Sequence, residues 1–113
     1  MLNQTLEHRR DPRVKVFWPV NLVRQDRTQY AAKTSNASAG GLQISTVAPV
    51  KKGEKVLIFL NAYFAGKNHE LKFIGKVAYT TFKEGRELSV GIQVISKRSD
   101  FKEVIEEFVQ QYI

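Results

Sequence analysis

With 113 residues, the chain is long enough for one domain with a hydrophobic core and leaves little for a second. Its 42% hydrophobic and 26% charged residues exclude a mainly disordered protein. The absence of Cys excludes disulfides, thiolate metal sites and a Cys nucleophile, and two His argue against a catalytic zinc site.

The charge of the chain is positive and uneven. Eighteen Lys and Arg against eleven Asp and Glu give a net charge of +7. Residues 100–113 carry four acidic side chains and one Lys, a net of −3, so the other 99 residues carry +10. This surplus points to an anionic partner, and the alternative is a solvated surface that keeps the protein soluble.

No targeting segment is evident at the start of the sequence. Residues 1–8 lack the apolar core of a signal peptide, and no apolar run approaches the length of about 20 residues that spans a bilayer. We therefore expect a cytoplasmic protein.

The first half of the chain reads as short strands. Apolar residues alternate from Arg13 to Leu22, which predicts a strand with one buried face. Pro19 cannot donate a ladder hydrogen bond and places this strand at an edge or beside a bulge. A turn at 24–27 leads to a weaker strand at 29–34, and the small polar residues 35–41 predict a loop.

Alternation resumes after this loop. Further strands are predicted over residues 42–45, 55–60, 71–81 and 88–94, with a polar stretch at 66–69. Gly75 indicates a bulge or bend, and Tyr79 falls on the same face as Phe73 and Val77. Six short strands joined by hairpin turns favour a small antiparallel barrel over a two-sheet sandwich.

The period changes at the C-terminus. Apolar residues recur every three or four positions, which predicts an amphipathic helix over about 100–113. Asp100 is suited to cap it, and Glu103 completes a capping-box-like pair. The helix either closes one end of its own barrel or packs on another chain, so monomer and homodimer both stay open.

Two short motifs carry chemical groups. The first, at residues 7–13, holds Arg9, Arg10 and Arg13 just before the first strand, and we expect residues 1–13 to form a flexible basic arm. Guanidinium forks bind phosphate oxygens and the Hoogsteen edge of guanine. Alone, the cluster is more typical of a basic arm that only solubilises the chain.

The second motif spans residues 36–41. Asn36 offers a donor and an acceptor, Ser38 offers a hydroxyl, and Gly40 and Gly41 let backbone amides approach a ligand closely. The alternative is an ordinary strand connection in which these side chains bind their own backbone.

Together the two motifs resemble the PilZ domain family. Arg9-x-x-x-Arg13 followed by Asn36-x-Ser38-x-x-Gly41 matches the family's RxxxR and [D/N]xSxxG signature in order and spacing. The likeness covers residues 7 to 95, and the combination is far more specific than either half.

The resemblance implies an all-β fold, a six-stranded antiparallel barrel over 14–113 with a C-terminal helix. It also implies the ligand cyclic di-GMP, a bacterial second messenger, without a cofactor or metal. The binding residues that it implies are Arg9, Arg10, Arg13, Asn36, Ser38, Gly40, Gly41 and Tyr79. His8 departs from the Arg frequently found there, which bears on whether one or two nucleotides bind.

We therefore expect a receptor and not an enzyme. The Arg arm orders over the bound nucleotide, and the new surface signals to a partner protein that controls an output such as motility or polysaccharide export. The alternatives are a protein-binding adaptor that has lost nucleotide binding and a single-stranded nucleic-acid binder.

Overall fold

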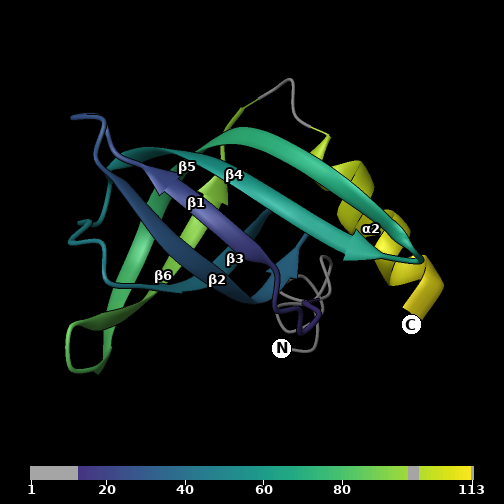
Figure 1. Ribbon diagram of the computed structural model, residues 1–113, viewed down its shortest axis with the longest axis horizontal. Coiled ribbons are helices and arrows are strands. Elements are labelled where there is room, and N and C mark those ends of the chain that lie inside the picture. Colours follow the sequence, from purple (N-terminus) through teal and green to yellow (C-terminus); the bar gives the residue numbers. More distant parts are fainter. Residues whose placement is uncertain (1–12, 97–99, 113) are drawn as a thin grey trace, which may run out of the picture.

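The computed structural model describes residues 13–96 and 100–112. The elements of this part of the chain, in order, are β1 (Pro19–Val23), β2 (Gln29–Ser38), β3 (Gly41–Thr46), β4 (Lys55–Phe64), β5 (Lys67–Glu84), β6 (Glu87–Val94) and α2 (Phe101–Tyr112) (Figure 1). The predicted class, an all-β antiparallel fold of six strands with a C-terminal helix, is confirmed. The arm residues Arg9 and Arg10 lie outside the described residues.

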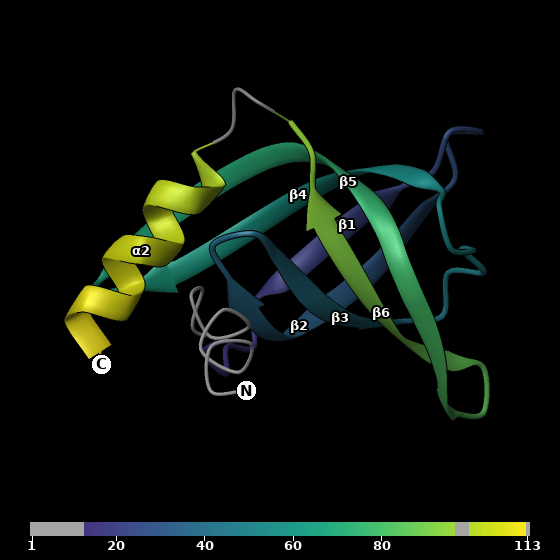
Figure 2. The same cartoon turned by 180° about the vertical axis from the view of Figure 1, so that it is seen from behind.

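The six strands close on themselves. Their order is β1-β2-β3-β6-β5-β4, and β1 also pairs with β4, where Asn21 lies opposite Phe59. Figure 2 shows β3, β6 and β5 side by side on the face opposite to that of Figure 1. Alternate residues point inward, so side chains such as Leu22, Ile44 and Phe73 fill the interior.

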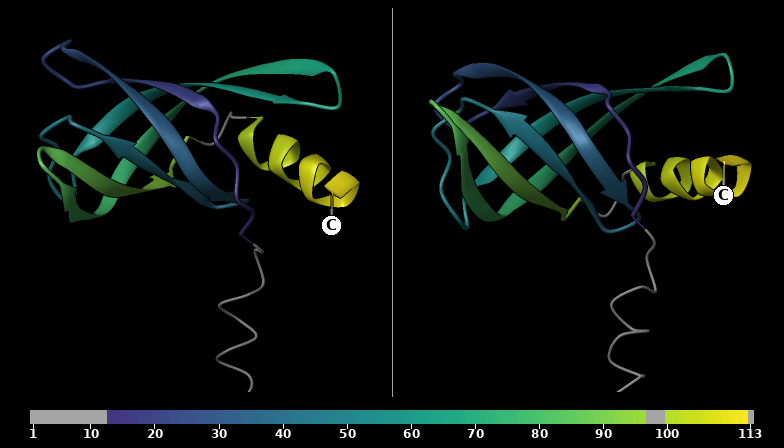
Figure 3. Two further views of the ribbon diagram at one scale, coloured as in Figure 1. Left: turned by 60° about the horizontal axis from the view of Figure 1, so that its bottom comes forward. Right: turned by 90° about the horizontal axis from the view of Figure 1, so that it is seen from below.

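The segment before β1 is extended but is not a strand. We call residues 13–18 the strap; they run between β2 and α2 (Figure 3). The prediction of one strand from Arg13 to Leu22 is wrong, because regular pairing begins only at Pro19. Before that point, Val14 and Ala37 form a single bridge through two hydrogen bonds of 2.8 and 2.9 Å.

A bulge in β2 explains why the strap leaves the ladder. The register of β2 shifts between Thr34 and Asn36, which leaves Ser35 as an extra residue. The buried Thr34 hydroxyl accepts the Trp18 N–H at 2.8 Å and donates to the Val16 carbonyl at 2.6 Å. This side chain satisfies backbone groups that a regular ladder would have paired.

The predicted loop at 35–41 is mostly strand. β2 continues to Ser38 and β3 begins at Gly41, so only Ala39 and Gly40 form the turn. The small polar composition misleads here, because pairing with β3 satisfies the backbone of residues 36–38.

The β4–β5 hairpin is longer than the sequence predicts. β4 extends to Phe64 and β5 starts at Lys67, which absorbs most of the expected polar stretch 66–69. Ala65 and Gly66 both have positive φ, 54° and 71°, as a two-residue type I′ turn requires.

A bulge in β5 decides where Tyr79 points. The register shifts between Val77 and Tyr79, so the expected alternation over 71–81 breaks at this point and Tyr79 is 40% exposed. The bulge does not lie at Gly75, which is buried. A Cβ on Gly75 would collide with the Ile92 side chain, so close packing is the reason for a glycine there.

Helix α2 packs on its own barrel. The Val104 N–H donates to the Asp100 carbonyl at 3.0 Å, which places Asp100 at the N-cap position. Phe101 is fully buried with its ring 4.9 Å from that of Phe73, and Phe108 contacts Trp18 of the strap edge to face at 5.5 Å. The helix is therefore a lid that also touches the strap.

The ion pair between Arg24 and Glu54 gives a test of the fold. Hydrogen bonds of 2.8 and 3.2 Å from Arg24 hold the pKa of the Glu54 carboxyl below its ordinary value. A lowered folded pKa stabilises the fold above the unfolded value and is lost as the pH falls through it.

We expect Glu54→Gln to lower the free energy of unfolding at neutral pH by about 1 kcal/mol, a typical value for such a pair. The difference from the wild type should vanish in urea titrations well below pH 4. If the free energies of unfolding of Glu54→Gln and the wild type differ by the same amount at neutral and at acidic pH, the assigned role of the ion pair is contradicted.

Candidate functional site

The structure brings Arg13, the last residue of the first motif, to the second motif. One cavity of about 170 Å³ is lined by Arg13 from the strap, Ser38 from β2, Gly40 from the following turn, Gly41 from the start of β3, and Tyr79 from β5. Five of the eight residues predicted to bind a ligand therefore share one cavity. β6 forms its floor through Gly91, Ile92 and Gln93.

Arg13 and Ser38 join the two motifs directly. The Arg13 Nη1 donates to the Ser38 hydroxyl at 3.2 Å, and that hydroxyl also lies 3.5 Å from the Gly41 carbonyl, to which it donates. Ser38 is buried at 5% exposure, whereas Arg13 is exposed. Among the described residues, the Ser38 hydroxyl is the one acceptor that the guanidinium binds, which leaves further N–H donors for a ligand beside the cavity.

Asn36 stands beside the cavity within a chain of side-chain hydrogen bonds across three strands. Its Nδ2 donates to Gln43 Oε1 at 2.7 Å, and Gln43 Nε2 donates to the Ser89 hydroxyl. Within the described part of the chain, the buried Asn36 Oδ1 has no hydrogen-bond partner. Since an unsatisfied buried acceptor costs about 1–3 kcal/mol, a donor placed here is favoured.

Two glycines shape the cavity by close packing. A Cβ on Gly41 would collide with the Ile92 carbonyl oxygen, so this glycine is required where β3 approaches β6. A Cβ on Gly91 would collide with the Tyr79 ring, so that ring lies flat against the β6 backbone. The β5 bulge turns Tyr79 outward, and the absence of a side chain at Gly91 leaves room for the Tyr79 ring in that position.

The sequence reasoning missed two residues of this region. Gln43 orients Asn36, and no pattern in the sequence distinguishes it from other polar strand residues. Gly91 lies in the predicted last strand, and a glycine within a strand is the signal that indicates close approach. Whether any of the predicted residues binds a ligand stays a prediction.

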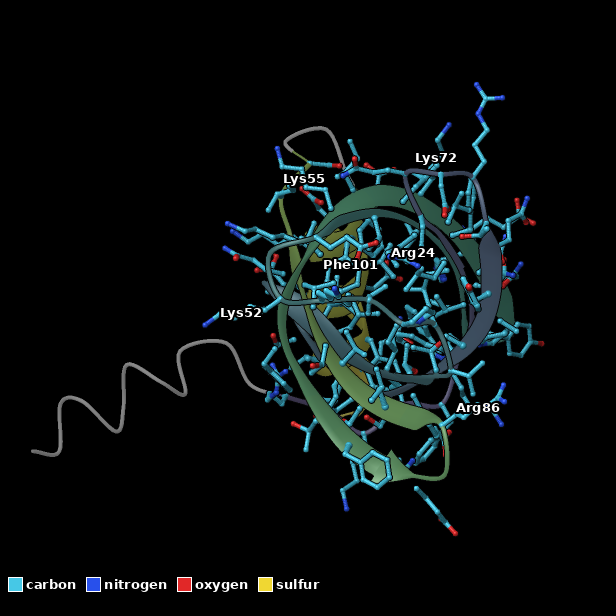
Figure 4. The ribbon with its side chains drawn as sticks, turned by 90° about the vertical axis from the view of Figure 1, so that its left-hand side faces the viewer. Arg24, Lys52, Lys55, Lys72, Arg86 and Phe101 are labelled. Atoms are coloured by element: carbon cyan, nitrogen blue, oxygen red, sulfur yellow. The ribbon has the colours of Figure 1, made fainter. Side chains whose placement is uncertain are left out.

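Positive side chains surround the barrel outside this cavity. Figure 4 shows Lys52, Lys55, Lys72 and Arg86 distributed around the barrel and not along one groove. Such a distribution attracts anions generally and does not by itself form a site. Among the described residues, no group of three or more His, Asp or Glu could hold a metal ion, and no helix is long and apolar enough to cross a membrane.

The contact between Gly91 and Tyr79 can be tested without a ligand. We expect Gly91→Ala to lower the free energy of unfolding by about 1–3 kcal/mol, because the new methyl group forces the ring away. Adding Tyr79→Ala removes the ring and should restore most of that loss, which urea unfolding of the four proteins in the cycle measures.

Gly41→Ala is the matched control for this cycle. Its collision is with the Ile92 backbone, so Tyr79→Ala should not relieve it. Additive effects of Gly91→Ala and Tyr79→Ala would contradict the packing described here.

Comparisons with known proteins agree with the motifs and the fold. Residues 7–111 match the family model of the PilZ domain. A search among curated proteins gives no significant match.

Three solved structures share the fold at low identity. The Inhibitor of motility MotI/DgrA of Bacillus subtilis is 10% identical with a TM-score of 0.74, and the match covers 91% of this chain and 49% of that one. The PilZ domain of YcgR from Escherichia coli, solved with c-di-GMP, is 11% identical with a TM-score of 0.70 and coverage of 91% and 89%. MrkH of K. pneumonia, solved as a c-di-GMP complex, is 16% identical with a TM-score of 0.63 and coverage of 91% and 51%.

The chain thus spans about half the length of MotI/DgrA and of MrkH and nearly the whole of the YcgR domain. The family match extends from the arginine motif to the C-terminal helix, and the six antiparallel strands follow the same fold. The resemblance drawn from the two motifs is confirmed, and the chain belongs to the PilZ domain family.

Proposed function

We propose that this protein is a cyclic di-GMP receptor. The observation that carries the proposal is the convergence of Arg13, Ser38, Gly41 and Tyr79 on one cavity, although they come from separate parts of the chain. Family membership supports it, as do the structures of YcgR and MrkH solved with c-di-GMP.

The side chains suit the parts of this ligand. Arg13 has an exposed guanidinium fork that fits phosphate oxygens or the O6 and N7 atoms of guanine. The Asn36 Oδ1 is an acceptor for a guanine N–H, and the Ser38 hydroxyl lies two residues farther along the same strand. Tyr79 offers a partly exposed ring on which a base stacks.

The arm supplies the remaining positive charge. In this proposal Arg9 and Arg10 close over the ligand, because the phosphates relieve the repulsion among these two side chains and Arg13. The arm and the ligand together form a surface that a partner protein recognises. The output, such as motility or polysaccharide export, depends on that partner.

The strap offers a second route for the signal. At the start of the strap Arg13 lines the cavity, and at its end Trp18 packs against Phe108 of α2. A ligand that displaces Arg13 therefore displaces the strap, which also contacts α2.

Binding without catalysis is the proposed activity. Among the described residues the one His is His69, whose ring stacks on Phe64 at 4.4 Å and whose Nδ1 lies 3.2 Å from the Ala62 carbonyl. These contacts place His69 in the β4–β5 hairpin, beside the packed rings of Phe64, Trp18 and Phe108. It does not line the candidate cavity.

Substitution of Arg13 tests the receptor proposal. Arg13→Ala removes charge-assisted hydrogen bonds worth about 1.5–3 kcal/mol, so we expect c-di-GMP to bind at least about tenfold more weakly. Isothermal titration of the full chain measures this loss. The midpoint of thermal unfolding should barely change, because the guanidinium is exposed.

Lys15→Ala is the matched control, because Lys15 is also exposed on the strap, is cationic and does not line the cavity. It should bind c-di-GMP as the wild type does. No binding heat from the wild type at tens of micromolar protein would overturn the receptor proposal and favour a protein-binding adaptor. A steep loss of oligonucleotide affinity with added salt, without c-di-GMP binding, would favour the nucleic-acid reading.

A further inference from the structure

A second, larger groove lies on the same outer face of the barrel. Its volume is about 480 Å³, and its lining includes Phe17 from the strap, Lys33 and Ser35 from β2, Ser45 from β3, and Lys83 and Glu87 from the ends of β5 and β6. None of these residues belongs to the motifs that predicted the first cavity.

Phe17 gives this groove an aromatic wall. Val16 and Trp18 point inward and are buried, so the alternation of the extended strap turns Phe17 outward, where it is 67% exposed. An exposed aromatic ring at the wall of a groove is a platform on which a planar base stacks, because both faces of a nucleobase are π surfaces.

Charged groups of both signs surround this ring. Lys33 is exposed, and the Lys83 ammonium donates to the Ser45 hydroxyl at 2.9 Å, which holds it over β3. The ammonium groups suit a phosphate, since ionised donors bind phosphate oxygens strongly. The half-buried Glu87 carboxylate accepts from N–H donors such as those on the edge of guanine.

The groove and the candidate site lie on neighbouring rows of cross-strand partners. Lys33 lies opposite Ser45, and Ser45 lies opposite Ser89. The next set of cross-strand partners is Asn36, Gln43 and Gly91, and Gly91 lines the first cavity. Arg13 and Phe17 are four residues apart on the extended strap, about 13 Å, so one strap borders both cavities.

We propose that this groove is a second nucleotide subsite, in which a purine base stacks on Phe17 and a phosphate lies between Lys33 and Lys83. The inference rests on the proposed function and deepens it. The base belongs either to the cyclic dinucleotide already held by Arg13 and Ser38 or to a second molecule of it, and the chemistry of the subsite is the same in both cases.

Isothermal titration of the full chain with c-di-GMP tests the subsite through Phe17→Ala and Lys83→Gln. Loss of a stacking platform weakens nucleotide binding by about tenfold or more. We expect Phe17→Ala to show a loss of this size and Lys83→Gln to weaken binding in the same direction. If the base belongs to the same molecule, the stoichiometry stays at one and the affinity falls. If it belongs to a second molecule, the stoichiometry falls from two to one.

Matched controls are available at residues that line neither cavity. Tyr63→Ala removes a ring of similar exposure, 62%, from β4, which borders neither β2, β3 nor β6. Lys72→Gln makes the same change of charge as Lys83→Gln at a residue that lines neither cavity. Both controls should bind as the wild type does, and circular dichroism checks that all variants are folded.

The outcomes separate this inference from the receptor proposal. If Phe17→Ala and Lys83→Gln bind as the wild type does while Arg13→Ala does not bind, the second subsite is overturned and the receptor proposal stands. If the wild type itself does not bind c-di-GMP, both are overturned. Equal losses in Phe17→Ala and Tyr63→Ala would also overturn the subsite, because the effect would then not depend on the groove.

Discussion

The attachment of the strap to β2 is the constraint on which both cavities depend. The strap cannot join the ladder beside the bulge at Ser35, and the buried Thr34 hydroxyl instead binds one backbone donor and one backbone acceptor. Because these bonds are shielded from water, they set the strap's register firmly. That register places Arg13 at Ser38, Phe17 at the second groove and Trp18 under the helix.

Bulges in β2 and β5 shape the face that carries the candidate site. One extra residue in β2 releases the strap, and another irregularity in β5 turns Tyr79 from the interior to the surface. Gly91 then leaves room for the ring against β6, and Gly41 lets β3 approach β6 closely. Each feature departs from the regular alternation of a strand, and together they concentrate polar and aromatic groups on one side of a closed sheet.

The same strap connects this face to the helix. Val14, Val16 and Trp18 are buried in the core, and Trp18 meets Phe108 while Phe101 anchors the start of α2. In the proposed complex a nucleotide contacts Arg13 and Phe17, which face outward on the strap, whereas Val14, Val16 and Trp18 of the strap face inward and are buried. The strap therefore links the outer face of the barrel to α2 by direct contacts.

The sequence alone determined the antiparallel class, the six strands, the C-terminal helix and the two motifs, because each depends on local period or on residue type within a few positions. It misplaced the loop at 35–41, and it assigned Tyr79 to the alternation of the core face. The first error arises because pairing with β3 overrides a small polar composition, and the second arises at the β5 bulge; only cross-strand pairing reveals either one. The arginine and glycine motifs marked the first cavity, whereas Gln43 and Phe17 carried no signal. Only the tertiary structure decided where these two side chains lie, since the strap's hydrogen bonds to Thr34 and the approach of β3 to β6 join residues far apart in the chain.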